Sequence, residues 1–313
     1  MTVPRLVRVI SVRHTMAISR KIKKVMHILN PLAGKGTAAK VKESISGSDY
    51  VYMSQSPSET SEFIKKSCQE SPDTCFTVYG GDGTVFRAVN ALMDSGCADK
   101  ATLKVVPVGS GNDFVRTFEG MHGEHLIDVL TFNGRYAANV INMGFDCSVV
   151  RRAVKLKKSP LIPGRLAYTF GIVGELINKK PMDATVTLTY SDGHTEVFKD
   201  KFLLIACGNC CWYGGGYKAV PCAKFDDGII DVALIKNVPT ATFLNLVSDY
   251  KKGTFVNPNT YEVEEKFKKH VIYKKCVGIK IEGCGAVCAD GEIFNENEVE
   301  IGIIPKAINL LLD

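Results

Sequence analysis

Three glycine-rich segments each combine a flexible backbone with a charged side chain, and this combination suits phosphate chemistry. They read NPLAGKG (30–36), GGDGTVF (80–86) and VGSGNDF (108–114). Glycine allows a backbone amide to approach phosphate oxygens without interference from a Cβ atom. A carboxylate beside phosphates is repulsive unless a cation lies between them, so Asp82 and Asp113 indicate a nearby Mg²⁺. Together the segments predict a site for a nucleoside triphosphate and a divalent metal.

The first of these segments supports two interpretations. Gly34, Gly36 and Ala39 match the G-x-G-x-x-A pattern of dinucleotide-binding turns. The acid that such turns place about 20 residues further on is not where that fold requires it, and the Walker A pattern does not occur. Lys35 between the glycines favours phosphate binding. The alternative is a plain turn between a strand and a helix.

Two acidic turns follow in the second half of the chain. The stretch AKFDDGIIDV places Asp226 and Asp227 on a tight glycine turn. This spacing suits a hard cation bound through oxygen ligands and suits an ordinary hairpin equally well. The stretch CADGEIF sets Asp290 and Glu292 on either side of a glycine. A carboxylate there could take a proton from a hydroxyl acceptor, although Asp-Gly is also a hairpin signal.

The order of strand-like and helical runs predicts where the glycine segments meet. In the first half of the chain, runs typical of buried strands (25–30, 49–54, 75–80, 103–109) alternate with amphipathic helical runs (58–69, 85–94). Such alternation predicts a parallel sheet with helices on its faces. Ligands of open α/β sheets bind at the carboxyl ends of the strands, and all three glycine segments would lie there.

From about Asn133 the pattern changes to strand-like runs with few helices between them. This change predicts a second, largely antiparallel β domain. A helical insertion interrupts it, over VVRRAVKLKK and GRLAYTFGIVGELIN, and the domain boundary is expected near 130–136 at the turn FNGR. The basic residues of RRAVKLKK (151–158) suit either anionic lipid headgroups or a solvated helix face.

The bulk composition fits a globular protein without a membrane span. The chain has 313 residues, a formal charge of +6 and eleven cysteines with no evident pairing pattern. No apolar run is long enough to cross a bilayer, and scattered thiols indicate a reducing, cytoplasmic compartment. The charge suits polyanions, nucleotides or an anionic membrane surface and does not distinguish among them. The basic residues 1–22 are expected to form a disordered arm.

Six motifs in order resemble one family of enzymes. They are NPLAGKG, GGDGTVF, VPVGSGNDFVR (106–116), GFDC (144–147), YGGGYKAVPCAKFDDGIIDV (213–232) and ADGE (289–292). This set resembles the bacterial diacylglycerol kinase-like lipid kinases, the soluble family related to eukaryotic diacylglycerol and sphingosine kinases. The match runs from about residue 23 to the C-terminus. GGDGT alone would be shared with NAD kinases and, more distantly, with phosphofructokinases.

The resemblance implies a fold of two domains with the active site in the cleft between them. An α/β ATP-binding domain with a parallel sheet would span 23–133, and the C-terminal segment 303–313 would return to it. A β-sandwich that carries the helical insertion would span 134–302.

The resemblance also assigns roles to residues of the three phosphate loops. The first loop would comprise Asn30, Pro31, Leu32, Ala33, Gly34 and Lys35, and the second Gly80, Gly81, Asp82, Gly83, Thr84, Val85 and Phe86. The third would contribute Asn112 and Asp113. Ser54 and Ser110 occupy positions where the family commonly has threonines that touch ATP.

Metal and proton-transfer roles follow from the same resemblance. Asp82 and Asp113 would organise the catalytic Mg²⁺, with Asp128 as a further candidate ligand. In FDDGII the family holds a structural Mg²⁺, which would take the carboxylate of Asp227 and the backbone carbonyls of Lys224 and Ile229. Glu292 matches the position usually assigned as the proton acceptor, and Asp290 is a rival that one sequence does not exclude.

These roles predict an ATP- and Mg²⁺-dependent lipid kinase that transfers the γ-phosphoryl group to a lipid hydroxyl. Diacylglycerol is the expected acceptor and phosphatidic acid the product. The enzyme would meet its lipid as a peripheral protein at the cytoplasmic membrane face, and would bind no nucleic acid. Phosphatidylglycerol, a sphingoid base and NAD stay open as acceptors, as does a homodimer. The alternative from another class is a catalytically silent nucleotide-binding regulator, against which the intact acids argue.

Overall fold

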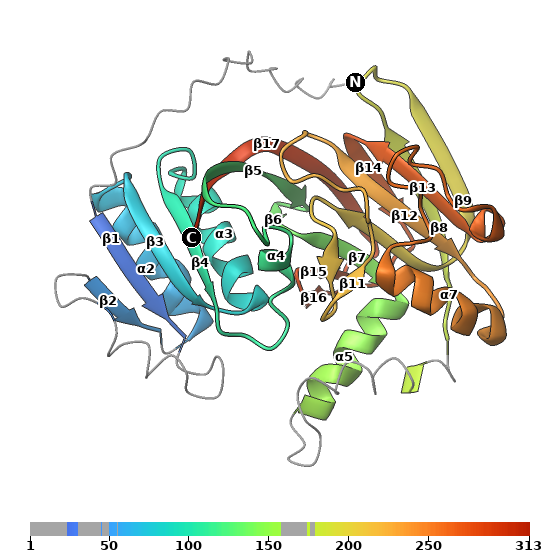
Figure 1. Ribbon diagram of the computed structural model, residues 1–313, viewed down its shortest axis with the longest axis horizontal. Helices are drawn as coiled ribbons and strands as arrows, with labels where there is room; N and C mark the ends of the chain where they lie inside the picture. The colour runs from blue at the N-terminus through green and yellow to red at the C-terminus, as the bar shows by residue number, and fades with distance from the viewer. Residues whose placement is uncertain (1–23, 31–44, 46–49, 55, 158–173, 176–178) are drawn as a thin grey trace.

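The computed structural model describes residues 24–30, 45, 50–54, 56–157, 174–175 and 179–313. Within them the chain forms an α/β domain and a β-rich domain, which lie side by side and share one continuous sheet (Figure 1). The expected order, an α/β domain with parallel strands and then an antiparallel β domain, is confirmed. Most of the predicted helical stretch GRLAYTFGIVGELIN lies outside the described residues, as do residues 1–22.

Four parallel strands build the sheet of the α/β domain, in the order β2–β1–β3–β4. Their bounds agree with the sequence prediction within two residues: β1 Lys24–Leu29, β2 Tyr50–Met53, β3 Thr74–Gly80 and β4 Thr102–Pro107. Every residue of β3 is buried, as expected of a central strand that is covered on both faces. The carboxyl ends of these strands therefore form one edge, from which the second and third glycine segments depart.

Among the described residues, two long helices cover the α/β domain and pack against each other, α2 (Pro57–Glu70) and α3 (Asp82–Ser95). Helix α3 lies between the parallel sheet and the β domain (Figure 1). The hydroxyl of Ser56 caps α2 by accepting a hydrogen bond from the amide of Glu59. Helix α3 begins directly after Gly81 with no side-chain cap, so its first amides are open to an anion.

The second domain is an antiparallel β-sandwich, in which each described strand pair is antiparallel. Its main strands are β7 Val140–Gly144, β8 Met182–Thr189, β9 Thr195–Gly208, β12 Ile230–Lys236, β13 Val271–Cys276 and β14 Gly278–Glu282. Two short hairpins complete it, β10 Trp212–Tyr213 with β11 Tyr217–Lys218, and β15 Val287–Ala289 with β16 Glu292–Phe294. Alternate residues of β8 are buried, which is typical of a strand with one face on a core.

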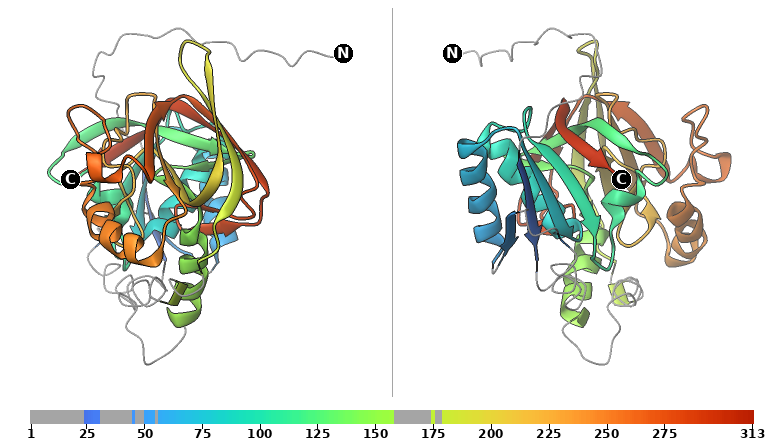
Figure 2. Two further views of the ribbon diagram at one scale, coloured as in Figure 1. Left: turned by 90° about the vertical axis from the view of Figure 1, so that its right-hand side faces the viewer. Right: turned by 60° about the vertical axis from the view of Figure 1, so that its left-hand side comes forward.

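Further helical elements lie in and beside the β domain. Helix α4 (Asp113–Arg116) follows the third glycine segment, and the 3₁₀ turn η2 (Glu265–Phe267) precedes β13. Helices α5 (Phe145–Lys157) and α7 (Thr240–Lys252) lie at the same end of the β domain (Figure 2). Among the described residues, no helix is both long and apolar enough to span a membrane.

Strands β5 (Gly123–Phe132) and β17 (Glu298–Leu312) run along both domains (Figure 1). Strand β17 pairs antiparallel with β14 through its first residues and parallel with β4 through 309–311. Between these contacts it bends at Lys306, whose φ is 52°, and the register against β5 shifts there. The turn FNGR connects β5 to β6 (Arg135–Ala137). The two domains are thus parts of one sheet.

Candidate active site

The second and third glycine segments meet at the carboxyl edge of the parallel sheet. The amide of Val108 donates to the carbonyl of Gly80 at 3.1 Å. A Cβ atom at Gly109 would lie 2.5 Å from the Cα of Gly81, so the two backbones approach more closely than any side chain would permit. These glycines therefore serve the packing of loop against loop, in addition to the access to phosphate expected from the sequence.

Thr84 is the side chain around which the second loop closes. A Cβ atom at Gly80 would lie 2.2 Å from its Oγ1, and the hydroxyl is reached by the Nδ2 of Asn30 at 3.5 Å. Thr84 is 6% exposed, so its side chain lies inside the loop. This contact connects the end of β1 to the loop after β3.

Asp82 ties the second loop to the third. It is the first residue of α3, and its Oδ1 accepts a hydrogen bond from the amide of Phe114 at 3.0 Å. Its Oδ2 receives no hydrogen bond from a described residue and lies where a Cβ atom at Gly111 would be 2.8 Å away. Asp82 therefore keeps one oxygen available at the junction of the two loops.

Asp113 reaches from the third loop to the β domain. Its carboxylate accepts hydrogen bonds from Arg116 Nη1 at 2.9 Å and from the amide of Gly215 at 2.6 Å. Gly215 belongs to the Gly214–Gly216 turn between β10 and β11, in which all three φ angles are positive. Burial raises the pKa of Asp113 to about 6, and the charge of Asp82 adds to this shift. The two acids thus lie within electrostatic range of each other.

The remaining members of the third loop lie around Asp113. The side chain of Asn112 donates to the carbonyl of Gly109 and accepts from its amide, both at 3.0 Å. Asn112 itself has a φ of 56°, in the left-handed region. Its amide group is therefore occupied within the loop, whereas Ser110 is exposed.

The ADGE motif forms the tight hairpin between β15 and β16. Asp290 and Gly291 have φ angles of 46° and 91°, as a two-residue turn of the Asp-Gly type requires. The carboxylate of Asp290 accepts hydrogen bonds from the amides of Ala138, Asn139 and Val140 at 2.8 to 3.1 Å. Burial raises its pKa to about 7 against the opposing effect of these amides. Asp290 therefore binds the hairpin to the chain that enters β7.

Glu292, two residues later, faces the other domain. Its Oε1 accepts a hydrogen bond from Nη2 of Arg87 on α3 at 3.1 Å, across a sequence separation of 205 residues. A Cβ atom at Gly83 would lie 3.1 Å from the same oxygen. The glutamate side chain is 40% exposed. The structure therefore brings Glu292 against the GGDGT loop, whereas three backbone amides hold the carboxylate of Asp290, whose raised pKa also reflects the charge of Asp82.

Asp128 lies apart from these loops, at the bend of β17. Its two carboxylate oxygens accept hydrogen bonds from the amides of Gly228 at 2.6 Å and Lys306 at 2.7 Å. Burial raises its pKa, and the nearby acids that add to this shift are Asp227 and Asp226. Asp128 thus joins the FDDG turn to β17, and its carboxylate is used within the fold.

The FDDG turn itself is partly neutralised by a lysine. Asp227 accepts a hydrogen bond from the amide of Ile229 at 3.1 Å, and its other oxygen lies 3.9 Å from Nζ of Lys275. That ammonium is held more closely by the fully buried Asp231, at 2.9 Å. The side chain of Lys224 is exposed. An exposed carboxylate with neighbouring carbonyls fits a hydrated divalent cation, although an ammonium group already shares its charge.

The described residues contain no group of three or more His, Cys, Asp or Glu side chains arranged to hold a metal ion. Mg²⁺ in phosphoryl-transfer sites usually takes one or two carboxylates, with substrate phosphates and water completing its shell. Asp82 fits this requirement through its available Oδ2. Asp113 fits less well, because Arg116 and Gly215 occupy both of its oxygens.

Other residues assigned to the nucleotide lie inside the fold or outside the described residues. The hydroxyl of Ser54 is buried and bonds Thr60 at 2.5 Å. Val85 is 3% exposed within the core, and Phe86 packs against Phe294 of β16, with ring centroids 6.2 Å apart. The stretch from Pro31 to Lys35 is not described.

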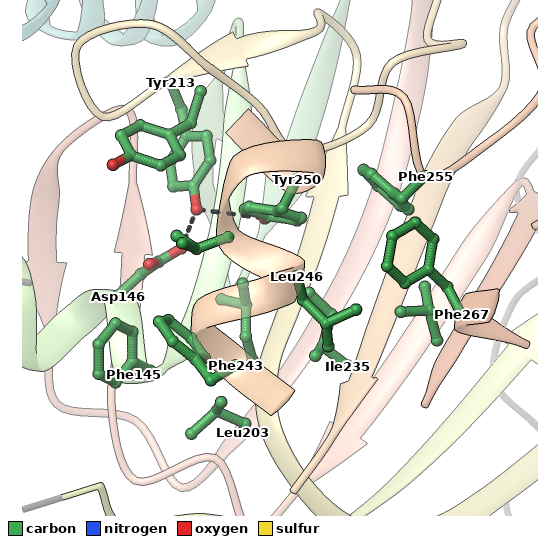
Figure 3. A pocket seen from close by; sticks show the side chains of 14 residues that line it. Phe145, Asp146, Leu203, Tyr213, Ile235, Phe243, Leu246, Tyr250, Phe255 and Phe267 are labelled. Atoms are coloured by element: carbon green, nitrogen blue, oxygen red, sulfur yellow. Dashed lines mark hydrogen bonds between the residues drawn. The ribbon is translucent and has the colours of Figure 1, made fainter. Parts of the chain in front are cut away.

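An apolar cavity of about 40 Å³ lies between α5, α7 and the sandwich (Figure 3). Phe145, Phe243 and Tyr250 are among its lining residues. Asp146 lies in its wall, and its carboxylate accepts a hydrogen bond from the hydroxyl of Tyr213, which also bonds Tyr250 at 3.2 Å. Burial raises the pKa of Asp146 to about 7. The GFDC motif therefore supplies a buried acid to an apolar site.

This cavity and Arg87 had no role in the sequence interpretation. Tyr213 immediately precedes the turn that donates to Asp113, so the cavity wall and the third loop are neighbours along the chain. The acid of GFDC, two residues after its glycine, was a signal for the first feature. Arg87 had none, because its partner is distant in sequence.

Comparison with known proteins accounts for nearly the whole chain. Residues 24–142 match the diacylglycerol kinase catalytic domain, and residues 139–312 match the YegS C-terminal NAD kinase beta sandwich-like domain. A diacylglycerol kinase of Mycobacterium tuberculosis is 26% identical over 316 residues, covering 93% of this chain and 96% of the relative. A protein named "Probable lipid kinase YegS-like" from Shewanella frigidimarina is 28% identical over 246 residues, 74% of each chain.

Solved structures show the same fold. The crystal structure of a diacylglycerol kinase from Bacillus anthracis matches with a TM-score of 0.64 at 21% identity and covers 94% of this chain and 98% of that one. The sandwich domain alone spans more than half of the chain, and the catalytic domain precedes it without a gap. The chain therefore belongs to the diacylglycerol kinase-like lipid kinase family.

Proposed function

We propose that this lipid kinase transfers the γ-phosphoryl group of ATP to a hydroxyl group of diacylglycerol and forms phosphatidic acid. The observation that carries the proposal is the approach of Glu292 to Gly83. It joins a carboxylate with an unbonded oxygen to the loop that would hold the phosphates. A kinase needs this juxtaposition, because the acceptor hydroxyl must lose its proton beside the transferred group.

The proposed reaction is a direct transfer between two oxygens. A lone pair of the acceptor hydroxyl attacks the γ-phosphorus while the bond from that phosphorus to the bridging oxygen of ADP breaks. The hydroxyl proton passes to Oε2 of Glu292 and from there to water. Positioning and electrostatics supply most of the acceleration in such transfers. The open amides at the start of α3, after Gly81, would bind phosphate oxygens.

Mg²⁺, when bound, would offset the negative charge that builds on the transferring phosphoryl group. Asp82 would hold it through Oδ2, beside Gly111. Asp113 would orient the third loop through Arg116 and Gly215 and act on the metal through Asp82. This proposal differs from the sequence prediction, in which both Asp82 and Asp113 were metal ligands.

Glu292 is favoured over Asp290 as the proton acceptor. Three backbone amides occupy the carboxylate of Asp290, so a substrate hydroxyl would have to displace a structural hydrogen bond. Oε2 of Glu292 receives no hydrogen bond from a described residue. The half-exposed glutamate can therefore accept a proton without breaking a contact of the fold.

The apolar cavity supports a lipid as the acceptor. It is lined almost wholly by aromatic and aliphatic side chains, in contrast to what NAD would require. At about 40 Å³ it is too small for an acyl chain as it stands. Helix α7 covers it with only Tyr250 buried, so an outward shift of α7 would enlarge it. The mycobacterial relative, a diacylglycerol kinase, supports diacylglycerol as the acceptor.

A competition among acceptors tests the proposed function. Purified protein, labelled ATP and Mg²⁺ are offered micelles of diacylglycerol, phosphatidylglycerol or sphingosine, and NAD in parallel. We expect label in phosphatidic acid and none after the substitution Asp82→Ala. Label on NAD alone would overturn the lipid assignment, and ATP binding without transfer to any acceptor would favour a regulatory protein.

The acceptor would be met at a membrane surface. The end of the β domain that carries α5 and α7 presents the exposed cations Arg151, Lys155, Lys251 and Lys252 and the exposed apolar side chain of Leu244. This combination suits an anionic bilayer. Cosedimentation with phosphatidylglycerol vesicles, and weaker cosedimentation with phosphatidylcholine vesicles, is the expected result for a peripheral enzyme at the cytoplasmic face.

A further inference from the structure

We infer that Arg87 is a positioning residue for phosphoryl transfer, which holds Glu292 in place against the phosphate loop. The inference rests on the proposed function. It assigns a role to a side chain that belongs to none of the six sequence motifs. Arg87 is on α3, one turn after Gly83, and it contacts both of the domains that must cooperate.

The guanidinium group makes two directed contacts. Nη1 donates to the carbonyl of Gly83 at 3.0 Å, and Nη2 donates to Oε1 of Glu292 at 3.1 Å. The first contact fixes the guanidinium to the loop, and the second fixes the glutamate to the guanidinium. Arginine presents several donors in a rigid plane and can make both contacts at once. Arg87 thereby fixes the position of Glu292 relative to the backbone that would bind the phosphates.

The space for this pair depends on the glycine of the loop. A Cβ atom at Gly83 would lie 3.1 Å from Oε1 of Glu292 and 3.6 Å from Nη1 of Arg87. A side chain there would push the pair outward by a few tenths of an ångström. Gly83 therefore admits the carboxylate to the loop, and Arg87 keeps it there.

The hairpin that carries Glu292 does not need Arg87 in order to dock. Phe86, the neighbour of Arg87, packs against Phe294, whose ring also lies 5.4 Å from that of Phe132. On the other side Asp290 binds three backbone amides. The strand is therefore held by apolar and backbone contacts, while the free rotation of the glutamate side chain is limited by Arg87. Loss of Arg87 should release a side chain and leave the hairpin in place.

Positioning has a distinct kinetic consequence. Arg87 occupies Oε1, and Oε2 is left as the oxygen that can accept the hydroxyl proton. Small displacements of a reacting group reduce turnover more than they reduce substrate binding. Removal of Arg87 should therefore lower kcat and leave the KM for ATP and for the lipid nearly unchanged.

A double-mutant cycle on diacylglycerol phosphorylation tests this role. Arg87→Leu should lower kcat by about tenfold with both KM values within about twofold of the wild type. Glu292→Gln removes the acceptor carboxylate, and Arg87→Leu added to it should lower kcat by less than about threefold more, because the two residues act as one unit. Arg87→Lys should restore part of the activity, since an amine keeps the charge but not both contacts.

Arg135→Leu is the matched control. Arg135 bonds Glu296 at 3.0 Å and lies over the ring of Phe294, at the same hairpin but away from Glu292. We expect its kcat to stay within about twofold of the wild type. A drop equal to that of Arg87→Leu would mean that any disturbance of the hairpin suffices, and would overturn the inference.

The remaining outcomes are equally decisive. Equal losses from Arg87→Leu in the wild-type and Glu292→Gln backgrounds would show that Arg87 acts independently, for example on the phosphates, and a raised KM for ATP would say the same. A lowered melting temperature together with lost nucleotide binding would reduce Arg87 to a structural role. A wild-type enzyme that is inactive on every lipid overturns the proposed function and this inference together, whereas an active enzyme with additive losses overturns only the inference.

Discussion

Two acidic turns of the β domain, ADGE and FDDG, consist of the same kinds of residue. They differ in which donors and cations contact their carboxylates. In ADGE, Glu292 projects to the other domain and keeps one oxygen unbonded. In FDDG, Asp227 lies between the amide of Ile229 and the ammonium of Lys275, and the turn is fixed to β17 through Asp128. The first turn presents a carboxylate to the other domain, whereas the charge of Asp227 in the second turn is partly neutralised by Lys275.

This difference shows that the role of an acidic side chain depends on how many hydrogen-bond donors contact its carboxylate. Asp290, within the reactive hairpin, has three amide donors and behaves like the acids of the FDDG region. Asp128, fully buried, has two amides. Carboxylates whose two oxygens both accept backbone hydrogen bonds stabilise structure, and those with one oxygen unbonded can take part in chemistry.

Glu292→Gln is the strongest test of this distinction. We expect kcat for lipid phosphorylation to fall by about 100-fold or more, as for loss of a general base, with the melting temperature and ATP binding unchanged. Asp290→Asn should do the reverse. Its amide group would face backbone donors, and the unfolding free energy should fall by about 2 kcal/mol while turnover survives. Urea unfolding and steady-state kinetics on both variants decide the assignment, and exchanged results would make Asp290 the proton acceptor.

Asp128→Asn measures how firmly the FDDG side is built into the fold. One of the two amides that Asp128 accepts would face an NH₂ group, so the unfolding free energy should fall by about 2 to 3 kcal/mol. The matched control is Asp226→Asn, because Asp226 is exposed in the same turn. Denaturant unfolding of both variants provides the measurement. If the two changes cost the same, Asp128 would not be a structural acid.

The pH dependence of Asp146 extends the comparison to a buried acid that accepts a hydrogen bond from a side chain, the hydroxyl of Tyr213. Burial raises its pKa from 3.8 to about 7, so the folded state favours the protonated acid. The stability this contributes is fully present below about pH 4 and is lost as pH rises through 7. Asp146→Asn never ionises. The unfolding free energy of the variant relative to the wild type should therefore increase between pH 4 and pH 8, and a constant difference would contradict the raised pKa.

Asp227→Asn should have the smallest effect. If a divalent cation binds the turn, Mg²⁺ should raise the melting temperature of the wild type by about 2 °C, a modest linkage effect, because Lys275 already lies 3.9 Å from Asp227. The variant should lose this rise and show the same melting temperature in EDTA. Calorimetry with and without Mg²⁺ is the measurement. An equal rise in both proteins would place the cation elsewhere.

The fold and the meeting of the second and third glycine segments were predictable because they depend on local patterns. Alternating strand and helix signals fixed the parallel sheet, and the carboxyl ends of neighbouring strands must share an edge. The same reasoning placed Asp82 and Asp113 close together, and the amide of Phe114, the neighbour of Asp113, donates to Asp82.

The parts that resisted prediction depend on contacts between distant residues. Arg87 belongs to a helix whose pattern indicates only an exposed polar position, and nothing local points to Glu292. Gly81 and Gly109 contact each other across two loops, which spacing along one loop cannot reveal. The roles of Asp128 and Lys275 likewise follow from the bend of β17 and from the buried Asp231, which are both set by tertiary packing.

The course of β17 has a consequence for how the enzyme is made. This strand is synthesised after every other described element, and it pairs with β14 in the sandwich and with β4 in the α/β domain. Until it leaves the ribosome, both partners keep a row of unpaired backbone groups, which invites association with other chains. The N-terminal domain therefore keeps an open edge at β4 until the end of synthesis. Both domains should acquire their native sheets in one late step, and a nascent chain stalled before Glu298 should depend on chaperones in both halves.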